Sequence, residues 1–395
     1  MKKKIERLNH QGEGITYVND KITFVKNALV DEEVELINIK EYKKYNVADA
    51  KIVNFSNKRV DPVCPYFGLC GGCSLQNMSY KDSLEFKVNK VKNILNRYAD
   101  LKIKDIDIIP SDNSFNYRNK ITLEIKKKLI GFKKYKSNEL VEIDKCYLAK
   151  ESINNIIEDL KKLDIINGKV TIRSNYNDEL ILIIETLDNI NITALDNHKI
   201  LGIILNDKII QGENKFMERI NNKFYQVSYN SFFQVNNDTT SKIMKYINNL
   251  INNEIVLDLY CGVGSLGLSL DNYKELYGVE IVPNAIKNAL VNKKINHKEN
   301  AYFFVGDTSN VLTKINKCFD AIIVDPPRSG MNKETLELIL NINPEKIIYV
   351  SCDPITLARD LNLMSNKYEL KSITLFDTFC YTYHVECVTL LHRNN

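Results

Sequence analysis

One cysteine near the carboxyl end of the chain has the residue type and setting that covalent catalysis requires. Cys352 follows an apolar, β-branched run at residues 347–350, which is typical of a buried strand. Asp353-Pro354 ends that strand, because proline donates no ladder hydrogen bond, and a helical segment follows. Open α/β sheets bind ligands at the carboxyl ends of their strands. The sequence therefore presents Cys352 as a candidate nucleophile, with a buried, unreactive thiol as the alternative.

A glycine-rich loop opens the last third of the chain. Strand-like residues 255–260 run into Gly262 and Gly264, which let the backbone approach a ligand at a helix N-terminus. Glu280 ends the next strand-like run, which is the usual place of a carboxylate that binds ribose hydroxyls. G-x-G-x-x-G followed by an acid also matches a dinucleotide site, so an NAD-dependent oxidoreductase is one interpretation.

Further acids follow the later strand-like runs, which alternate with helical segments. Asp307 follows one of them, and Asp325 begins an Asp-Pro-Pro sequence after another. This alternation predicts a parallel sheet with helical crossovers. The carboxyl ends of its strands would bring the glycine loop, the acids and Cys352 to one edge.

Four of the nine cysteines form a separate pattern. Cys64, Cys70 and Cys73 are closely spaced around two glycines, and Cys146 can close the set from further along the chain. Four thiolates suit zinc or an iron–sulfur cluster equally well on chemistry alone. A reduced, metal-free set is the alternative, and an odd number of cysteines disfavours a disulfide framework.

The composition is that of an ordinary globular protein, with an uneven distribution of charge. Residues 1–150 carry 29 Lys and Arg against 20 Asp and Glu, whereas the remainder carries 25 against 30. A basic front end favours a polyanionic partner, with solvated lysines as the alternative. The sequence contains neither an apolar run of membrane-spanning length nor a secretory leader. We therefore expect a cytoplasmic protein without membrane contact.

The chain divides into three predicted regions. Residues 1–58 show short alternating strands typical of a small β-barrel. Residues 59–225 combine the cysteines, a helical segment and further strands, which predicts a central α+β domain. Residues 226–395 have the strand–helix alternation of an α/β domain. The fold class expected is therefore multidomain, with a barrel, an α+β domain and a Rossmann-like domain.

Several motifs, in this order along the chain, together resemble the RNA 5-methyluridine methyltransferases. They are CPYFGLCGGC, SYNSFFQVN, LYCGVGSLGL, GVEIVPNAI, DPPRSG, SCDPITLARDL and HVE. The likeness extends to the N-terminal region, which resembles the family's oligonucleotide-binding TRAM barrel. It implies a class I, S-adenosylmethionine-dependent enzyme that methylates C5 of a uridine in RNA.

The resemblance also implies residue roles and partners. Cys352 would be the nucleophile and Glu386 the general base. The cofactor and uracil pocket would be lined by Gln234, Tyr260, Gly262, Gly264, Glu280, Asp307 and Asp325. A [4Fe–4S] cluster would be held by Cys64, Cys70, Cys73 and Cys146. The expected substrate is 23S ribosomal RNA, ahead of the transfer RNA T-loop, and the expected state is a monomer.

Some features leave alternatives open. Ser265 and Cys380-Tyr381 depart from the family pattern. The alternative to a catalytic role for Glu386 is a surface acid on an edge strand. Phe232 and Phe233 are stacking candidates for a flipped uridine or ordinary core aromatics. His384 is interpreted as structural rather than catalytic, and a non-catalytic RNA-binding protein is the remaining alternative function.

Overall fold

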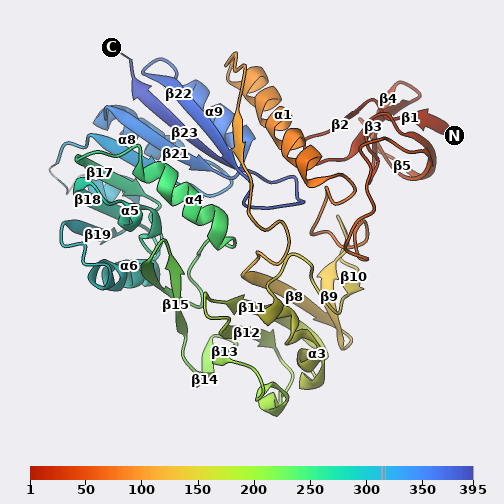
Figure 1. Ribbon diagram of the computed structural model, residues 1–395, viewed down its shortest axis with the longest axis horizontal. Helices are drawn as coiled ribbons and strands as arrows, with labels where there is room; N and C mark the ends of the chain where they lie inside the picture. The colour runs from red at the N-terminus through yellow and green to blue at the C-terminus, as the bar shows by residue number, and fades with distance from the viewer. Residues whose placement is uncertain (313–314, 316, 395) are drawn as a thin grey trace.

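The structure is a computed structural model that describes residues 1–312, 315 and 317–394. Its N-terminal sheet comprises β1 (Lys2–Lys4), β2 (Arg7–Leu8), β3 (Gly14–Val18), β4 (Lys21–Val25), β5 (Glu33–Glu41) and β6 (Asn46–Asn54). The strand order is β1-β5-β6-β4-β3-β2. Its two edge strands are joined by only two residues, so the sheet must curl upon itself (Figure 1). The predicted barrel is thus seen as a curled sheet around Val25 and Val34.

A second sheet forms the central part of the molecule. Its strands are β8 (Lys120–Lys126), β9 (Leu129–Lys133), β10 (Leu140–Glu142), β11 (Asn167–Ser174), β12 (Leu180–Thr186), β13 (Ile200–Leu205) and β14 (Lys208–Gly212). The apolar core beside it includes α2 (Glu151–Asn154), α3 (Ile157–Leu160), η1 (Lys161–Leu163) and η2 (Ile192–Leu195). The hairpin of β15 (Lys215–Ile220) and β16 (Lys223–Ser228) leads on to the C-terminal region.

The C-terminal sheet has the predicted strand–helix alternation. Its strands are β17 (Glu254–Leu259), β18 (Tyr273–Glu280), β19 (Ala301–Val305), β20 (Ala321–Val324), β21 (Lys346–Ser351), β22 (Tyr368–Phe376) and β23 (Glu386–Arg393). The intervening helices are α4 (Asn237–Asn248), α5 (Ser265–Ser269), α6 (Pro283–Ile295), α7 (Thr308–Leu312), α8 (Lys333–Ile342) and α9 (Pro354–Met364). Strands β17 to β21 are mutually parallel, whereas β23 runs antiparallel to both of its neighbours.

One part of the predicted central region belongs with the C-terminal sheet. Helix α1 (Tyr80–Tyr98), capped by Ser79, buries Val91 and Leu95 in a core shared with that sheet. Strand β7 (Asp107–Ile109) pairs with β22 at the sheet edge. Residues 59–225 are therefore not one contiguous body, because local patterns do not reveal which distant surface a helix covers. Figure 1 shows α1 between the N-terminal and C-terminal sheets.

No helix in the described ranges is both long and apolar enough to cross a membrane.

Candidate functional site

The glycine loop after β17 forms an open cradle at the carboxyl edge of the C-terminal sheet. Tyr260, Gly262 and Gly264 all have positive φ, at 61°, 55° and 78°. A Cβ on Gly262 would meet no atom within 4 Å, so its backbone faces open space. A Cβ on Gly264 would lie 2.9 Å from the Phe303 ring, which explains why the turn needs glycine there. The loop thus exposes backbone toward a ligand while it packs tightly beneath.

Two acids shape this loop. Glu280, at the end of β18, accepts hydrogen bonds from the Gly262 N–H at 3.1 Å and the Val282 N–H at 2.9 Å. Asp258, which is buried on β17, accepts one from the Gly267 N–H at 3.0 Å. Burial raises the pKa of Asp258 to about 8. Sequence reasoning missed Asp258, although an acid inside an apolar strand just before the loop was a usable signal.

The remaining predicted cofactor residues lie around the same edge. Asp325 follows β20, and burial raises the pKa of its carboxyl to about 7. The Tyr260 hydroxyl donates to Thr335 Oγ1 at 3.3 Å. Asp307 is exposed after β19, and Gln234 is half-buried in the segment between β16 and α4. The Gln234 carbonyl accepts a hydrogen bond from the Asn119 side chain at 3.1 Å. Their roles toward a cofactor stay predictions.

Cys352 and Glu386 occupy opposing positions on neighbouring strands. The last ladder pair between β21 and β23 joins Ser351 to Cys387. The next residues in that antiparallel register are Cys352 and Glu386. Glu386 is only 3% exposed, and β23 lies between β21 and β22 rather than at an edge. The interpretation of Glu386 as a surface acid on an edge strand is therefore wrong.

The electrostatics of this pair favour protonated side chains before a substrate binds. Burial, followed by the negative charge of Glu386, raises the pKa of the Cys352 thiol to about 12. Burial, followed by Asp325, raises the pKa of Glu386 well above its usual range. Arg328 opposes both shifts. The buried carboxyl of Glu386, with half-buried Asp325 and the half-buried thiol beside it, thus forms a site in which protons are retained until another group takes them.

A loop at residues 377–385 carries Glu386 into place, and helix α1 anchors that loop. Lys87 and Asp377 form an ion pair in which both side chains are fully buried. Lys87 Nζ also donates to the Phe379 carbonyl at 3.0 Å, and Lys90 Nζ donates to the Tyr383 carbonyl at 2.7 Å. Sequence reasoning missed these two lysines, because they lie about three hundred residues from their partners.

Cys380 and Tyr381, the two residues of this loop that depart from the family pattern, are both held by contacts with their surroundings. Cys380 is buried and its thiol donates to the Asp377 carbonyl at 3.3 Å. Tyr381 has a φ of 56°, and its ring stacks on Phe115 with centroids 4.8 Å apart. The Tyr381 carbonyl accepts hydrogen bonds from the N–H groups of Ser74 and Leu75, at 3.1 and 3.0 Å. The loop of residues 377–385, which the proposed mechanism makes the catalytic loop, is thereby joined directly to the loop that carries Cys64, Cys70 and Cys73, the cysteine loop.

His384 contacts Arg328 and Tyr383. Burial, followed by nearby cations that include Arg328, lowers the pKa of its imidazole to about 3. Arg328 donates toward its Nε2 at 3.5 Å, and its ring lies 4.1 Å from that of Tyr383. The imidazole is therefore neutral and tilted against the Tyr383 ring, and its structural interpretation stays a prediction.

Cys64, Cys70, Cys73 and Cys146 line one cavity of about 440 Å³. Burial raises the pKa of the Cys64, Cys70 and Cys73 thiols, that of Cys70 to about 11. Within the described residues, no three His, Cys, Asp or Glu side chains are arranged to hold a metal ion. The iron–sulfur cluster therefore stays a prediction. Phe232 is 69% exposed on this cavity, whereas Phe233 is a core residue.

A largely parallel sheet with a glycine-loop cradle at the carboxyl ends of its strands is typical of an enzyme that binds a nucleoside cofactor. A family model described as tRNA (uracil-5-)-methyltransferase matches residues 175–394. An uncharacterized RNA methyltransferase of Clostridium tetani is 34% identical, with 98% of this chain and 95% of that protein covered. Another, from Clostridium acetobutylicum, is 33% identical, with 98% and 96% covered.

A solved structure agrees with these relatives. The Pyrococcus abyssi tRNA (uracil-54, C5)-methyltransferase in complex with S-adenosyl-L-homocysteine has a TM-score of 0.84 and 29% identity, covering 99% of this chain and 100% of that one. The chain belongs to the tRNA (uracil-5-)-methyltransferase family and is an RNA uracil-C5 methyltransferase that uses S-adenosylmethionine. The alternatives of an NAD-dependent oxidoreductase and a non-catalytic RNA-binding protein are therefore wrong.

Proposed function

We propose that this enzyme methylates C5 of a specific uridine through a covalent bond between Cys352 Sγ and C6 of the base. The observation that carries the proposal is the position of Cys352 opposite the buried Glu386, beside Asp325 and near the glycine cradle. A lone buried cysteine would not need a buried carboxyl as its neighbour, since such a carboxyl is costly to fold.

The chemistry gives each residue a task. Uracil C5 is a poor nucleophile, and addition of the Cys352 thiolate to C6 makes C5 enolate-like. When bound, S-adenosylmethionine would supply an electrophilic methyl group to C5, and the S–CH3 bond would break to leave S-adenosylhomocysteine. C5 then carries both the methyl group and its original hydrogen. Glu386, which must first have lost its own proton, removes that hydrogen as a proton, the C5–C6 double bond re-forms, and the C6–S bond breaks to release the thiolate.

The glycine cradle and its acids provide the cofactor site in this proposal. Gly262 leaves open space for a ligand, and Glu280 stands at the end of β18 where a ribose hydroxyl would be bound. Tyr260, Gly264, Asp307 and Asp325 lie around the same edge, and Gln234 would reach the pocket from the β16–α4 segment. A Gly262→Val substitution would fill the open space.

Ribosomal RNA is the substrate we propose first, and transfer RNA is the second candidate. The resemblance that favours 23S ribosomal RNA rests on the cysteines and the N-terminal barrel. The Pyrococcus abyssi tRNA enzyme, however, covers the whole chain, so the N-terminal sheet does not separate the two substrates. Either way the target must leave its stack to reach Cys352, which favours a loop or single-stranded segment.

We also propose that Cys64, Cys70, Cys73 and Cys146 hold a [4Fe–4S] cluster. The support is a donor set of four thiols that line one cavity. The cluster would brace the cysteine loop, and no electron transfer is required of it.

The decisive experiment maps 5-methyluridine by mass spectrometry in both RNA classes from a strain that lacks the gene. We expect the strain to lack one 5-methyluridine, which the wild-type gene restores and the Cys352→Ala gene does not. That result would identify the substrate and support the mechanism. An unchanged set of 5-methyluridines in both RNA classes would contradict the proposed reaction. Restoration by Cys352→Ala would contradict the covalent mechanism alone.

A further inference from the structure

Helix α6 presents a row of asparagines to strand β16. Asn288 and Asn292 lie one turn apart on the helix, and Asn296 follows at its end, so the three side chains share one face. Asn288 is 2% exposed and Asn292 is fully buried. Buried amides are costly unless their donors and acceptors are paired, and each of these asparagines is bonded to a neighbouring segment.

Asn292 and Asn296 bond to β16 in the same way. Asn292 Oδ1 accepts a hydrogen bond from the Gln226 N–H at 2.6 Å, and its Nδ2 donates to the Gln226 carbonyl at 3.1 Å. Asn296 accepts from the Phe224 N–H at 3.1 Å and donates to the Phe224 carbonyl at 2.7 Å. Each side chain thus pairs with β16 as a peptide group of a further strand would.

Asn292 has an additional bond to the glycine loop. Its Nδ2 donates to the carbonyl of Val263 at 3.0 Å, whereas the remaining bond of Asn296 goes to the Asn292 carbonyl. The Gly267 N–H, which an α-helical pattern would direct to the Val263 carbonyl, donates instead to Asp258. Asn292 therefore supplies the donor that this loop carbonyl would otherwise lack.

The rest of the loop is fixed from its other sides. The Gly262 N–H donates to Glu280 at 3.1 Å, and the Gly264 N–H donates to the Cys261 carbonyl at 2.8 Å. With the bond from Asn292, these contacts set the path of the loop backbone before a ligand binds. A loop ordered in advance loses less conformational entropy on binding, which strengthens affinity.

The same face of α6 holds the segment that leads to Gln234. Asn288 Nδ2 donates to Ser228 Oγ at 2.9 Å and to Ser231 Oγ at 3.2 Å. Arg173, which is buried on β11, donates to the Ser231 carbonyl at 2.7 Å. This segment is thus fixed from two sides. When Asn292 is lost, the glycine loop is therefore the part that is free to move.

We infer that Asn292 is a positioning residue for the cofactor site. Its bond to the Val263 carbonyl holds the glycine loop in the conformation that binds the cofactor, in a fixed relation to the segment that carries Gln234. Asn292 acts through the loop backbone and is not assigned a contact with the cofactor. The inference rests on the proposed function for the claim that this loop binds S-adenosylmethionine.

The test compares Asn292→Ala with Asn296→Ala in the full-length protein. Both variants lose a pair of bonds to β16, but only Asn292→Ala also loses the bond to the loop. Calorimetric titration with S-adenosylhomocysteine should show affinity weakened roughly tenfold in Asn292→Ala. Asn296→Ala should stay within about twofold of wild type. Equal affinities for the two variants would overturn the inference.

Urea unfolding selects a temperature at which the variants are folded, so that a loss of stability alone does not alter the affinity. Hydrogen exchange of the wild-type protein is a second measurement that does not depend on Asn292→Ala folding. The amides of Gly262 and Gly264 should exchange slowly before S-adenosylhomocysteine is added. Rapid exchange of both amides in the cofactor-free protein would contradict a loop that is ordered in advance.

Gly262→Val separates this inference from the proposed cofactor site. If Gly262→Val abolishes S-adenosylhomocysteine binding while the two asparagine variants bind equally, the site is kept and the inference alone is rejected. If Gly262→Val binds as wild type does, the loop is not the cofactor site and both are rejected. A protein that methylates no uridine but shows the Asn292 difference would reject the proposed reaction and keep the inference.

Discussion

At the scale of single residues, Cys352 and Glu386 act at different moments of the proposed reaction, so their variants should fail differently. Cys352→Ala removes the group that bonds to C6, and both adduct and product should vanish. Glu386→Gln leaves addition and methyl transfer possible but keeps the C5 proton, so a methylated protein–RNA adduct should accumulate on denaturing gels.

The control is wild-type enzyme with RNA that contains 5-fluorouridine, which should form the adduct because no base removes the fluorine. Normal turnover by Glu386→Gln, or a fluorouridine adduct with Cys352→Ala, would show that the roles are wrongly assigned.

The raised pKa values predict a pH dependence with a definite sign. The Cys352 thiol, with a pKa of about 12, must lose its proton to attack, and the thiolate fraction grows as pH rises. The rate of adduct formation with 5-fluorouridine RNA should therefore increase by up to about tenfold per unit between about pH 6 and 9. Rapid-quench gels at saturating RNA measure it. A flat profile would contradict the prediction, because it would require a thiol that is already ionised below about pH 6 in the complex or a rate limited by another step.

The sequence locates the chemical groups at this scale, but it does not show how they are arranged. Cys352, Glu280 and Asp325 were found because each follows a strand-like run, and such residues share one edge of a parallel sheet. Cys352 lies opposite Glu386 because β21 and β23 pair in one particular antiparallel register. No local sequence pattern encodes that register. Asp258 was overlooked because its contact, a hydrogen bond from the Gly267 N–H, exists only once the loop has folded back on the strand.

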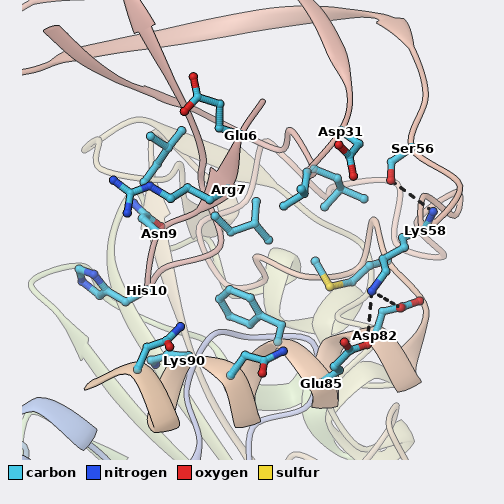
Figure 2. A pocket seen from close by; sticks show the side chains of 18 of the residues that line it. Glu6, Arg7, Asn9, His10, Asp31, Ser56, Lys58, Asp82, Glu85 and Lys90 are labelled. Atoms are coloured by element: carbon cyan, nitrogen blue, oxygen red, sulfur yellow. Dashed lines mark hydrogen bonds and ion pairs between the residues drawn. The ribbon is translucent and has the colours of Figure 1, made fainter. Parts of the chain in front are cut away.

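At the scale of elements, helix α1 serves two functions. Its buried face packs on the C-terminal sheet and anchors the loop of residues 377–385. Its other face lines the space between the helix and the N-terminal sheet (Figure 2). The periodicity of apolar residues predicted the helix, and residues 80–98 are helical. Its partners were unpredictable, since Lys87 and Asp377 are brought together only by the tertiary fold.

Loss of the Lys87–Asp377 ion pair should destabilise the protein strongly. Lys87→Met leaves the Asp377 carboxylate buried without its cation, which costs about 3–5 kcal/mol. Urea unfolding should show this loss, and Lys87→Met/Asp377→Leu should recover most of it because neither charge remains. Lys81→Met, an exposed lysine on the same helix, is the control and should stay within about 0.5 kcal/mol of wild type. Equal stability of Lys87→Met and the control would contradict the prediction.

At the scale of the whole molecule, we expect the N-terminal sheet to contribute to RNA binding. The β5–β6 hairpin carries Tyr42 and Tyr45, whose rings stack with centroids 4.9 Å apart, beside Lys43 and Lys44. The triple variant Tyr42→Ala/Lys43→Gln/Lys44→Gln should weaken RNA binding through lost stacking and charge, by about 1–3 kcal/mol for each base that it unstacks. Affinity for S-adenosylmethionine, measured by calorimetry, should not change. Equal loss of both affinities would indicate a structural role for the hairpin.

The cysteine cavity makes its own prediction. Protein purified without oxygen should be brown and contain iron, with broad absorbance in the violet-blue that is lost in Cys70→Ser. Cys318→Ser, which alters an exposed cysteine outside the cavity, is the matched control and should keep the colour. A colourless wild-type protein with stoichiometric zinc would contradict the cluster while leaving the methyltransferase assignment intact.

The hydrogen bonds that join the cysteine loop to the catalytic loop bear on the lifetime of the enzyme–RNA adduct in the cell. Ser74 and Leu75, next to Cys73, both donate to the Tyr381 carbonyl, five residues before Glu386. Damage that unfolds the cysteine loop would therefore disturb proton removal more than the earlier attack by Cys352. We expect oxidative stress to prolong the life of the enzyme–RNA adduct rather than to prevent it. An oxidised cell would then accumulate RNA with this enzyme still attached, an obstacle to the RNA's next use.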